Sequence, residues 1–344
     1  MSNIARPLKT HAATSLAILS FLLLTLPAQA EAPTCGGQSL LPKIEAASPG
    51  AIARMEAEAA KIANGQGKLW KVEKAGLAPS WLLGTLHVTD DRVTVLTPAT
   101  QAAFDEADTV VIETTDILDP AKMAVAMATP NLTSLPGKET LKTVLPPDKY
   151  AELAAALTAR GIPPITVAKM KPWLITAALA IPACEMTRKA NGLPVLDQML
   201  GEDALETGKQ LIGLETALSQ FEAMDKVPME FHVAGLISML KMGGMTTDLF
   251  ETMTELYLKG QTGMIKPLFD ETGKAMPELA GDTEGYAEFE QIMVDQRNKG
   301  MAENSAPILA QGDAFIAVGA LHLPGKNGLV EEFRKLGYTL TAVE

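Results

Sequence analysis

The sequence predicts an α/β protein with a mixed central β-sheet and a helical middle region. Two apolar runs of strand length, one early and one late, both lead into the pattern Gly-x-Leu-His, and helical periodicity dominates about residues 145–300 between them. Each run is followed by a loop, a helix and a further strand. We therefore expect two pseudo-symmetric units whose histidines meet near one seam.

The first unit is expected to open with a hairpin. Its first strand alternates polar and apolar residues, as a half-buried strand does, and its second strand is mainly apolar. Thr97 and Pro98 supply an N-cap and a first-turn proline for the helix that follows. In chain order we expect strands at 68–74 and 80–87, a loop at 88–92, a helix at 97–107 and a strand at 109–113.

The second unit repeats this order near the C-terminus. In both units the histidine, His87 or His322, stands three positions after a glycine, which lets a neighbouring backbone or a ligand come close. Gly337 is expected to end the helix of the second unit. We expect a strand at 315–322, a loop at 323–328, a helix through residue 335 and a strand at 338–343.

The N-terminus has the features of a secretory signal peptide. Two basic residues precede an apolar run at 12–26, and an Ala-x-Ala cleavage pattern ends at Ala30. We expect residues 1–30 to be removed, with no stable membrane insertion afterwards, and the mature protein to be periplasmic or secreted. The mature chain is then divided into an N-terminal extension at 31–67, extended over 31–50 and helical over 51–63, and a main domain at 68–344.

Export changes how the two cysteines are interpreted. In an oxidising compartment Cys35 and Cys184 can pair, which would join the mature N-terminus to the middle of the chain. A disulfide of this kind stabilises a fold by about 2 to 4 kcal/mol, chiefly by restricting the unfolded chain. The alternative is that both cysteines are free buried thiols.

The charge balance excludes some classes of partner. Removing the two basic residues among residues 1–30 leaves 27 Lys and Arg against 41 Asp and Glu, a net charge of −14 compared with −12 for the full chain. So acidic a surface repels nucleic acid and anionic lipid headgroups. We therefore expect no nucleic-acid partner.

The middle region adds a second strand-end carboxylate. A short strand at 210–215 ends in Glu215, and a methionine-rich helix or helix pair at 228–258 is interrupted by Gly243-Gly244. Thioether sulfur can bind Cu(I), but an adaptable apolar packing face is the commoner role of such methionines. His232 lies here without partner spacing, so we expect it to be structural.

The remaining polar residues could form a catalytic site. The sequence has no Gly-x-Ser-x-Gly elbow, P-loop, dinucleotide-binding glycine motif or His-Glu-x-x-His helix. It does have the two strand-end histidines, the carboxylates Glu113 and Glu215, and Arg297-Asn298 before the last unit. Such a set can bind a divalent metal, polarise a carbonyl and activate water, and an arginine can steady an anion or a carboxylate. Taken singly, each could instead be a core histidine, a member of a buried ion pair or a solvated strand end.

Six segments carry a resemblance to a known family. They are Trp81-Leu82-Leu83-Gly84-Thr85-Leu86-His87, Val111-Ile112-Glu113, Met170-Lys171-Pro172-Trp173, Gly213-Leu214-Glu215-Thr216, Asp295-Gln296-Arg297-Asn298 and Val318-Gly319-Ala320-Leu321-His322-Leu323-Pro324-Gly325. In this order they resemble the TraB/GumN family, from about residue 68 to the C-terminus. That family is similar to the Tiki proteins, metal-dependent proteases that cut near the N-termini of secreted signalling proteins, and more distantly to the erythromycin esterase and ChaN-like fold.

The resemblance implies a mixed sheet with surrounding helices and a cleft that bears both histidines. It implies a divalent ion, Mn²⁺, Co²⁺ or Zn²⁺, bound by His87, His322 and Glu113, with Glu113 also available to activate water. The catalytic residues would then be Glu113, His87, His322 and Arg297, with Glu215 and Asn298 on the substrate side of the site.

Two functions from different classes follow from these observations. The favoured one is an exported metal-dependent hydrolase, a peptidase whose substrate is a peptide or secreted protein. The other is a non-catalytic periplasmic protein that binds a peptide or restrains a secreted signal, in which the methionine-rich helices would matter more than the histidines. An esterase acting on a small molecule is a third possibility, which the distant fold relatives keep open.

Overall fold

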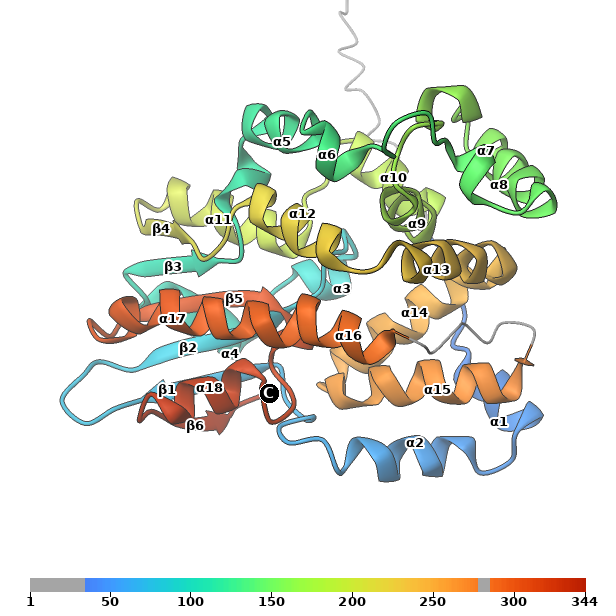
Figure 1. Cartoon of the computed structure of the whole chain (residues 1–344). Coiled ribbons are helices and arrows are strands. Elements are labelled where there is room, and N and C mark those ends of the chain that lie inside the picture. Colours follow the sequence, from blue (N-terminus) through green and yellow to red (C-terminus); the bar gives the residue numbers. More distant parts are fainter. Residues whose placement is uncertain (1–34, 278–284) are drawn as a thin grey trace, which may run out of the picture. The chain divides into compact units, whose positions relative to one another are not determined.

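A computed structural model describes residues 35–277 and 285–344. In this part of the chain a six-stranded mixed sheet is covered by helices, so the predicted α/β class is confirmed (Figure 1). The predicted signal peptide, residues 1–30, lies outside the described residues. The division into an extension and a main domain at residue 68 stays a prediction.

The strand order along the sheet is β4-β3-β5-β2-β1-β6. The first four of these are mutually parallel, whereas β1 pairs antiparallel with both β2 and β6, so β1 alone runs against the other strands of this sheet. The predicted hairpin is β1 with β2. The strands are β1 (Leu69–Glu73), β2 (Ser80–Thr85), β3 (Thr109–Ile112), β4 (Gln210–Gly213), β5 (Ala314–Gly319) and β6 (Thr339–Ala342).

The two strands that lead to the histidines, β2 and β5, are direct neighbours. Gly84 is paired with Val318 and Thr85 with Gly319, so both strands end at the same level of the sheet. A Cβ added to Gly84 would lie only 3.0 Å from the Cα of Ala320. The glycine before the first histidine therefore permits the close approach that the sequence predicts.

Alternate side chains of the central strands enter two apolar cores, one on each face of the sheet. Leu82 and Ile316 belong to the core beneath α17 (Arg297–Leu309) and α18 (Leu329–Lys335). Leu83 and Phe315 belong to the core beneath α4 (Pro98–Glu106) and α11 (Leu196–Glu206). Parallel strands buried on both faces are apolar at nearly every position, which explains their continuous apolar runs.

Each Gly-x-Leu-His strand continues through a helix to another strand with the same direction. β2 leads through α4 to β3, which lies beyond β5, and β5 leads through α18 to β6, which lies beyond β2 and β1. The two connections proceed in opposite senses along the sheet, and their helices cover opposite faces. The predicted pseudo-symmetry is therefore present, with the β2–β5 pair at its centre.

Two further apolar clusters lie among helices beside the sheet. The methionine-rich segment forms a helix pair, and Met239, Met242 and Met253 pack in these clusters, which is the packing role considered above. His232 is buried and contacts the Met224 carbonyl oxygen, in agreement with a structural role. The helices are α1 (Leu41–Ala47), α2 (Ala51–Ala59), α14 (Met245–Leu258) and α15 (Ile265–Ala275) in one cluster, and α7 (Leu141–Val144), α8 (Pro147–Ala159), α9 (Pro172–Ala180) and α13 (Met229–Met242) in the other.

The expectation that residues 31–50 are extended is wrong over Leu41–Ala47, which forms α1. Ile44 of this helix is fully buried in the cluster with α14 and α15. The Glu45 carboxylate also accepts hydrogen bonds of 2.7 Å from the Gly50 N–H and 3.0 Å from the Ile52 N–H, at the start of α2. Burial against distant helices outweighs a local composition rich in Pro, Gly and Ser.

Cys35 and Cys184 form a disulfide bond, as predicted. The bond joins residues 149 positions apart, and Cys184 lies on α10 (Ala183–Ala190). Among the helices formed by residues 35–277 and 285–344, none has both the length and the apolar character needed to cross a membrane.

The packing at Gly84 predicts the effect of one added methyl group. In Gly84→Ala the new Cβ would meet the Cα of Ala320 at 3.0 Å and the Cδ2 of Leu323 at 3.1 Å, so the turn that carries His322 must shift. We expect the free energy of unfolding, measured by urea denaturation, to fall by about 1 to 3 kcal/mol. Gly235→Ala in α13 is the control, because nothing lies within 4 Å of its added Cβ and alanine favours helix. Equal stability of the two variants would contradict this account.

Candidate functional site

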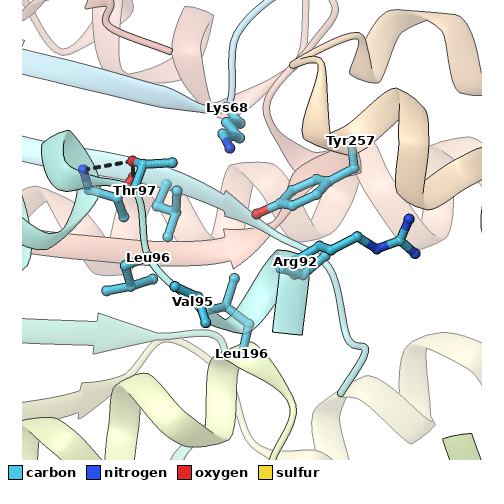
Figure 2. A pocket seen from close by; sticks show the side chains of 10 residues that line it. Lys68, Arg92, Val95, Leu96, Thr97, Leu196 and Tyr257 are labelled. Carbon is cyan, nitrogen blue, oxygen red and sulfur yellow. Dashed lines mark hydrogen bonds between the residues drawn. The ribbon is translucent and has the colours of Figure 1, made fainter. Parts of the chain in front are cut away.

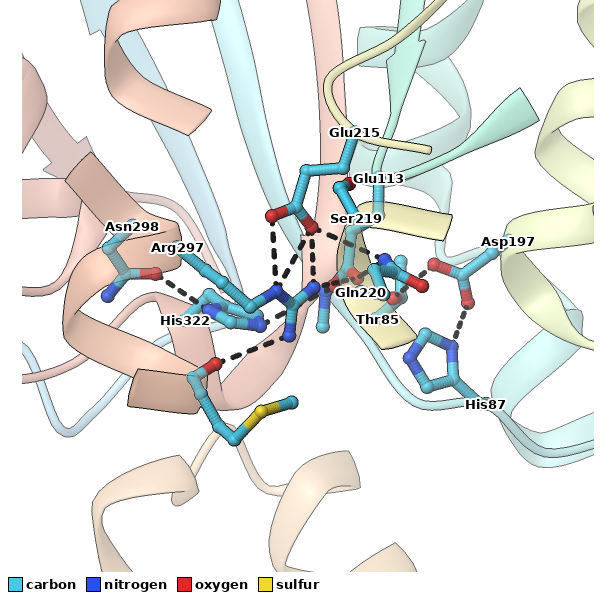
Figure 3. A network of polar contacts seen from close by, with 12 residues as sticks. Thr85, His87, Glu113, Asp197, Glu215, Ser219, Gln220, Arg297, Asn298 and His322 are labelled. Carbon is cyan, nitrogen blue, oxygen red and sulfur yellow. Dashed lines mark hydrogen bonds and ion pairs between the residues drawn. The ribbon is translucent and has the colours of Figure 1, made fainter. Parts of the chain in front are cut away.

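The four parallel strands have their carboxyl ends on the same side of the sheet. In open α/β sheets, ligands bind on this side, beyond the carboxyl ends of the strands. Residues just beyond these ends are His87 after β2, Glu113 after β3, Glu215 after β4 and His322 after β5. Arg297, the first residue of α17, points to the same place (Figure 3). The structure therefore brings together five residues that the sequence analysis selected from separate segments.

The position of Gly319 shows how closely three of these side chains converge. A Cβ added there would lie 3.0 Å from Glu113 Oε1, 3.5 Å from His322 Cδ2 and 3.7 Å from His87 Nε2. His322 Nε2 is itself 3.7 Å from Glu113 Oε1. The two histidines thus meet, as predicted, at one small polar space beside Gly319. This space stays open because Gly319 has no side chain.

His87 is oriented by a buried carboxylate. Asp197 Oδ2 lies 2.7 Å from His87 Nδ1, and Asp197 Oδ1 accepts a hydrogen bond of 2.7 Å from the Thr85 hydroxyl. Desolvation acts to lower the pKa of His87, but the negative charges of Asp197 and Glu113 outweigh it and raise that pKa to about 9. Nδ1 therefore donates to Asp197, and Nε2 faces the space beside Gly319.

His322 is buried and uncharged. Burial lowers its pKa to about 4, and the nearby positive charge of Arg297 acts in the same direction. Its Nδ1 lies 2.7 Å from Asn298 Oδ1, and the Asn298 amide is fixed because its Nδ2 donates to the Asn327 carbonyl oxygen at 2.8 Å. An amide oxygen can only accept, so Nδ1 of His322 carries the hydrogen and Nε2 is free to act as an acceptor or a ligand.

Glu113 is held on both carboxylate oxygens. Oε1 accepts a hydrogen bond of 2.6 Å from the Gly319 N–H, and Oε2 accepts from Arg297 Nη2 at 2.9 Å and from Gln220 Nε2 at 3.2 Å. Burial would raise the pKa of Glu113, but His322 when it is protonated at low pH, the charges of Arg297 and His87, and the Gly319 N–H together lower it to about 2. The carboxylate therefore stays ionised although it is buried.

Arg297 links Glu113 to the second strand-end carboxylate. Its Nε lies 3.1 Å from both oxygens of Glu215, and its Nη2 lies 2.6 Å from Glu215 Oε2. Burial would lower the pKa of Arg297, but the two carboxylates raise it, so the guanidinium stays charged. The segment before it, η5 (Gln291–Gln296), is a π-helical turn, a rare feature that is frequent at functional sites.

Two polar residues of this network were missed by the sequence analysis. Asp197 lies in α11 and Gln220 in α12 (Ala217–Lys226), and neither belongs to a motif. An available signal for Asp197 was a carboxylate between the buried positions Leu196 and Leu200 of an apolar helix face. Asn298 was expected on the substrate side, and in the structure it is fully buried against His322. Its part in substrate binding stays a prediction.

The donor atoms match a divalent ion in kind. Both imidazoles have Nδ1 engaged with an oxygen atom, which leaves Nε2 as the ligand atom, the usual orientation of metal-binding histidines. Within residues 35–277 and 285–344, however, no group of three or more His, Cys, Asp or Glu side chains is arranged to hold a metal ion. The kind and orientation of the two imidazoles thus fit a metal ion. The Glu113 oxygens, in contrast, already accept hydrogen bonds from the Gly319 N–H and Arg297.

A small pocket close to β2 is distinct from this network (Figure 2). Its volume is about 20 Å³, enough for roughly one water molecule. The Tyr257 hydroxyl, on its wall, donates a hydrogen bond of 2.9 Å to the Gly84 carbonyl oxygen. The pocket is too small for a substrate, and Tyr257 supports the strand that leads to His87. Its lining includes Lys68, Arg92, Val95, Leu96, Thr97, Leu196 and Tyr257.

Comparisons with known proteins agree with the resemblance seen in the sequence. A model of the TraB/PrgY/gumN family matches residues 68–342. Metalloprotease TIKI2 is 24% identical over 315 residues in Xenopus tropicalis and 24% identical over 321 residues in Danio rerio. Metalloprotease TIKI1 of Xenopus tropicalis is 24% identical over 315 residues. Each match covers 78% of this chain, and this chain spans 58% to 60% of the length of these relatives.

The contact between Asp197 and His87 predicts a titration. Asp197→Asn keeps the shape of the side chain and removes its charge, so we expect the pKa of His87 in the metal-free protein to fall from about 9 toward its usual value of about 6.5. Because the folded-state pKa is raised, the pair stabilises the fold fully below about pH 6.5 and loses this effect as the pH rises through about 9. NMR of the histidine ring measures the shift, and an unchanged pKa would show that Asp197 does not set the charge of His87.

Proposed function

The chain belongs to the TraB/PrgY/gumN family, and on that premise we propose that it is an exported metal-dependent hydrolase that cleaves a peptide or a secreted protein. The observation that carries this proposal is the convergence of His87, His322 and Glu113 on the space beside Gly319. The relatives named metalloproteases support the reaction class.

We propose His87, His322 and Glu113 as the residues that hold a divalent ion, Mn²⁺, Co²⁺ or Zn²⁺. Mixed nitrogen and oxygen donors suit all three ions. When bound, such an ion supplies Lewis-acid polarisation of a substrate carbonyl and activation of water. The other steps are assigned to the side chains of the protein.

The side chains of the site divide into those that react and those that hold them. Asp197 and Asn298 fix the two rings so that each Nε2 faces the shared space. Glu113, ionised and held by Arg297 and the Gly319 N–H, is proposed to take a proton from water.

The exposure of the two rings gives the direction of substrate approach. The His87 side chain is 58% exposed, whereas the His322 side chain is 8% exposed. A peptide therefore enters from the His87 side. Arg297 and Glu215, which are paired with each other, are proposed to support the bound substrate and to steady negative charge on it.

Export is part of the proposal. It is based on the signal-peptide pattern of residues 1–30. The Cys35–Cys184 disulfide supports it, because such bonds persist in oxidising compartments. The proposed location is the periplasm or the extracellular medium.

Activity toward a peptide library tests the reaction. With Mn²⁺ or Co²⁺ we expect cleavage that a chelator abolishes, and we expect His87→Ala and His322→Ala each to lower kcat/KM by about 100-fold or more. His232→Ala is the matched control, since His232 is a buried histidine whose ring contacts the Met224 carbonyl oxygen outside the site. It should retain the activity of the unmodified protein.

Other outcomes of the same experiment would identify a different function. Peptide that is retained without cleavage, unaffected by chelator and by both substitutions, would support the non-catalytic binding protein. Cleavage that persists in the presence of chelator and in both variants would show that the proposed site does not take part in the reaction. A panel of small esters tests the esterase alternative, which requires ester hydrolysis that exceeds peptide cleavage.

Metal content tests the proposed ligands without any substrate. We expect elemental analysis of protein purified without added metal to find about one divalent ion per chain. His87→Ala and His322→Ala should lose most of this ion, and His232→Ala should keep it. Equal metal content in all four proteins would show that the two strand-end histidines are not ligands.

A further inference from the structure

Helix α10 (Ala183–Ala190) is attached to the protein without an apolar face. Glu185 is its one buried residue, at 1% exposure, and the side chain of Met186 is 39% exposed. A surface helix is ordinarily held by a buried apolar stripe. Here a buried carboxylate and the neighbouring disulfide at Cys184 take that role.

The Glu185 carboxylate is hydrogen-bonded to the chain two residues after His87. Its Oε2 accepts a hydrogen bond of 2.8 Å from the Thr89 N–H and one of 2.9 Å from the Thr89 hydroxyl. Its Oε1 lies 3.0 Å from Arg188 Nη1. Asp197 thus restrains the His87 ring, and Glu185 restrains the backbone two residues further along.

The disulfide joins this carboxylate to a fixed part of the fold. From Cys35 the chain lies along α14, where the Gln38 N–H donates to Asp248 Oδ1 at 3.0 Å and the Leu40 N–H donates to Thr252 Oγ1 at 2.7 Å. The bond to Cys184 therefore connects α10 to α14. Without it, this covalent link between α10 and the segment along α14 is lost.

We propose that Glu185 is a positioning residue for His87 and that the Cys35–Cys184 disulfide keeps Glu185 in place. This inference rests on the proposed function in one respect, that His87 belongs to the reacting site. Its consequence is that the reduced protein is less active than the oxidised one. A chain that has not yet reached an oxidising compartment then has weak hydrolytic activity.

The chemical step that separates the two states is thiol–disulfide exchange with a dithiol reductant. A thiolate of the dithiol attacks one sulfur of the Cys35–Cys184 bond, which breaks as a mixed disulfide forms. The second thiol of the reductant displaces the remaining cysteine as a thiolate. The protein gains two electrons and two protons as two thiols, and the dithiol is oxidised to a disulfide.

Matched substitutions of two buried carboxylates test the role of Glu185. Glu185→Gln keeps the shape and weakens the hydrogen bonds to Thr89. Glu271→Gln is the control, because Glu271 is also buried, at 3% exposure, and is paired with Arg54 and Lys274 on the α2–α15 side of the protein. Both variants lose the charge of a buried carboxylate that is paired with a basic side chain, but only the first is expected to change the loop after His87.

The first readout is amide hydrogen exchange of the peptide that contains residues 86–91 in the metal-free protein. We expect this peptide to exchange about tenfold faster in Glu185→Gln, since a hydrogen bond to a charged acceptor is replaced by a weaker one to a neutral acceptor. The double variant Cys35→Ser with Cys184→Ser, and the unmodified protein treated with dithiothreitol, should show the same change. Glu271→Gln should leave the exchange of residues 86–91 unchanged.

The second readout is kcat/KM for the peptide cleaved by the unmodified protein. We expect a decrease of about 10-fold to 100-fold in Glu185→Gln and in the double serine variant, mainly in kcat, as is usual when the support of a site histidine is removed. Glu185→Asp should recover part of the rate. Glu271→Gln should retain it.

The two readouts separate a failure of this inference from a failure of the proposed function. Unchanged exchange at residues 86–91 in Glu185→Gln and after reduction would overturn the inference, whatever the activity. Faster exchange with full activity would also overturn it, because His87 would then be correctly placed without Glu185. Faster exchange in a protein that cleaves no peptide would uphold the structural link and would refute the proposed function alone.

Discussion

The parallel pairing of β2 with β5 is the constraint on which the site depends. Because Thr85 is opposite Gly319, both Gly-x-Leu-His segments leave the sheet at one level, and residues 235 positions apart in the chain, His87 and His322, approach the same carboxylate. A shift of one residue in this register would turn every side chain of one strand to the opposite face. The glycines make this arrangement possible, since an added Cβ would lie 3.0 Å from Ala320 Cα at Gly84 and 3.0 Å from Glu113 Oε1 at Gly319.

The polar network at this edge is organised to keep charges ionised in a buried place. Two carboxylates removed from water repel each other, and burial disfavours a negative charge. Arg297 lies between them with a planar group that reaches both, and the Gln220 amide donates to both as well. Burying such a network contributes little to stability, because the desolvation penalty offsets the attraction. Strongly shifted pKa values in a strand-end cluster are typical of functional sites.

Features encoded locally could be predicted from the sequence, and features that depend on distant partners could not. The strands, the glycines and the strand-end positions of His87, Glu113 and His322 follow from short patterns that need no knowledge of the fold. The partners of these residues carry no such pattern. Asp197 is 110 residues from His87, and Glu185 is 96 residues from Thr89.

Helix α1 could not be predicted from the sequence, for the same reason that these partners could not. Its local composition favours an extended chain, and its helical state depends on the burial of Ile44 against α14 and α15, more than two hundred residues later in the sequence. The disulfide could be predicted because the expected export favours pairing and the sequence contains one possible pair of cysteines. Which helix the bond would hold, and which loop that helix supports, required the structure.

The net charge of the site favours a bound cation, and this reasoning does not depend on the similarity to the TIKI metalloproteases. The network contains three carboxylates, those of Glu113, Glu215 and Asp197, and one guanidinium, that of Arg297. With both imidazoles neutral, as ligation of a metal requires, the negative charges exceed the positive charges by two. An uncompensated charge inside a protein is strongly unfavourable. The divalent cation proposed to bind His87 and His322 would cancel this excess. In the metal-free protein a proton on His87 offsets part of the same excess, which explains why Asp197 and Glu113 raise the pKa of that ring.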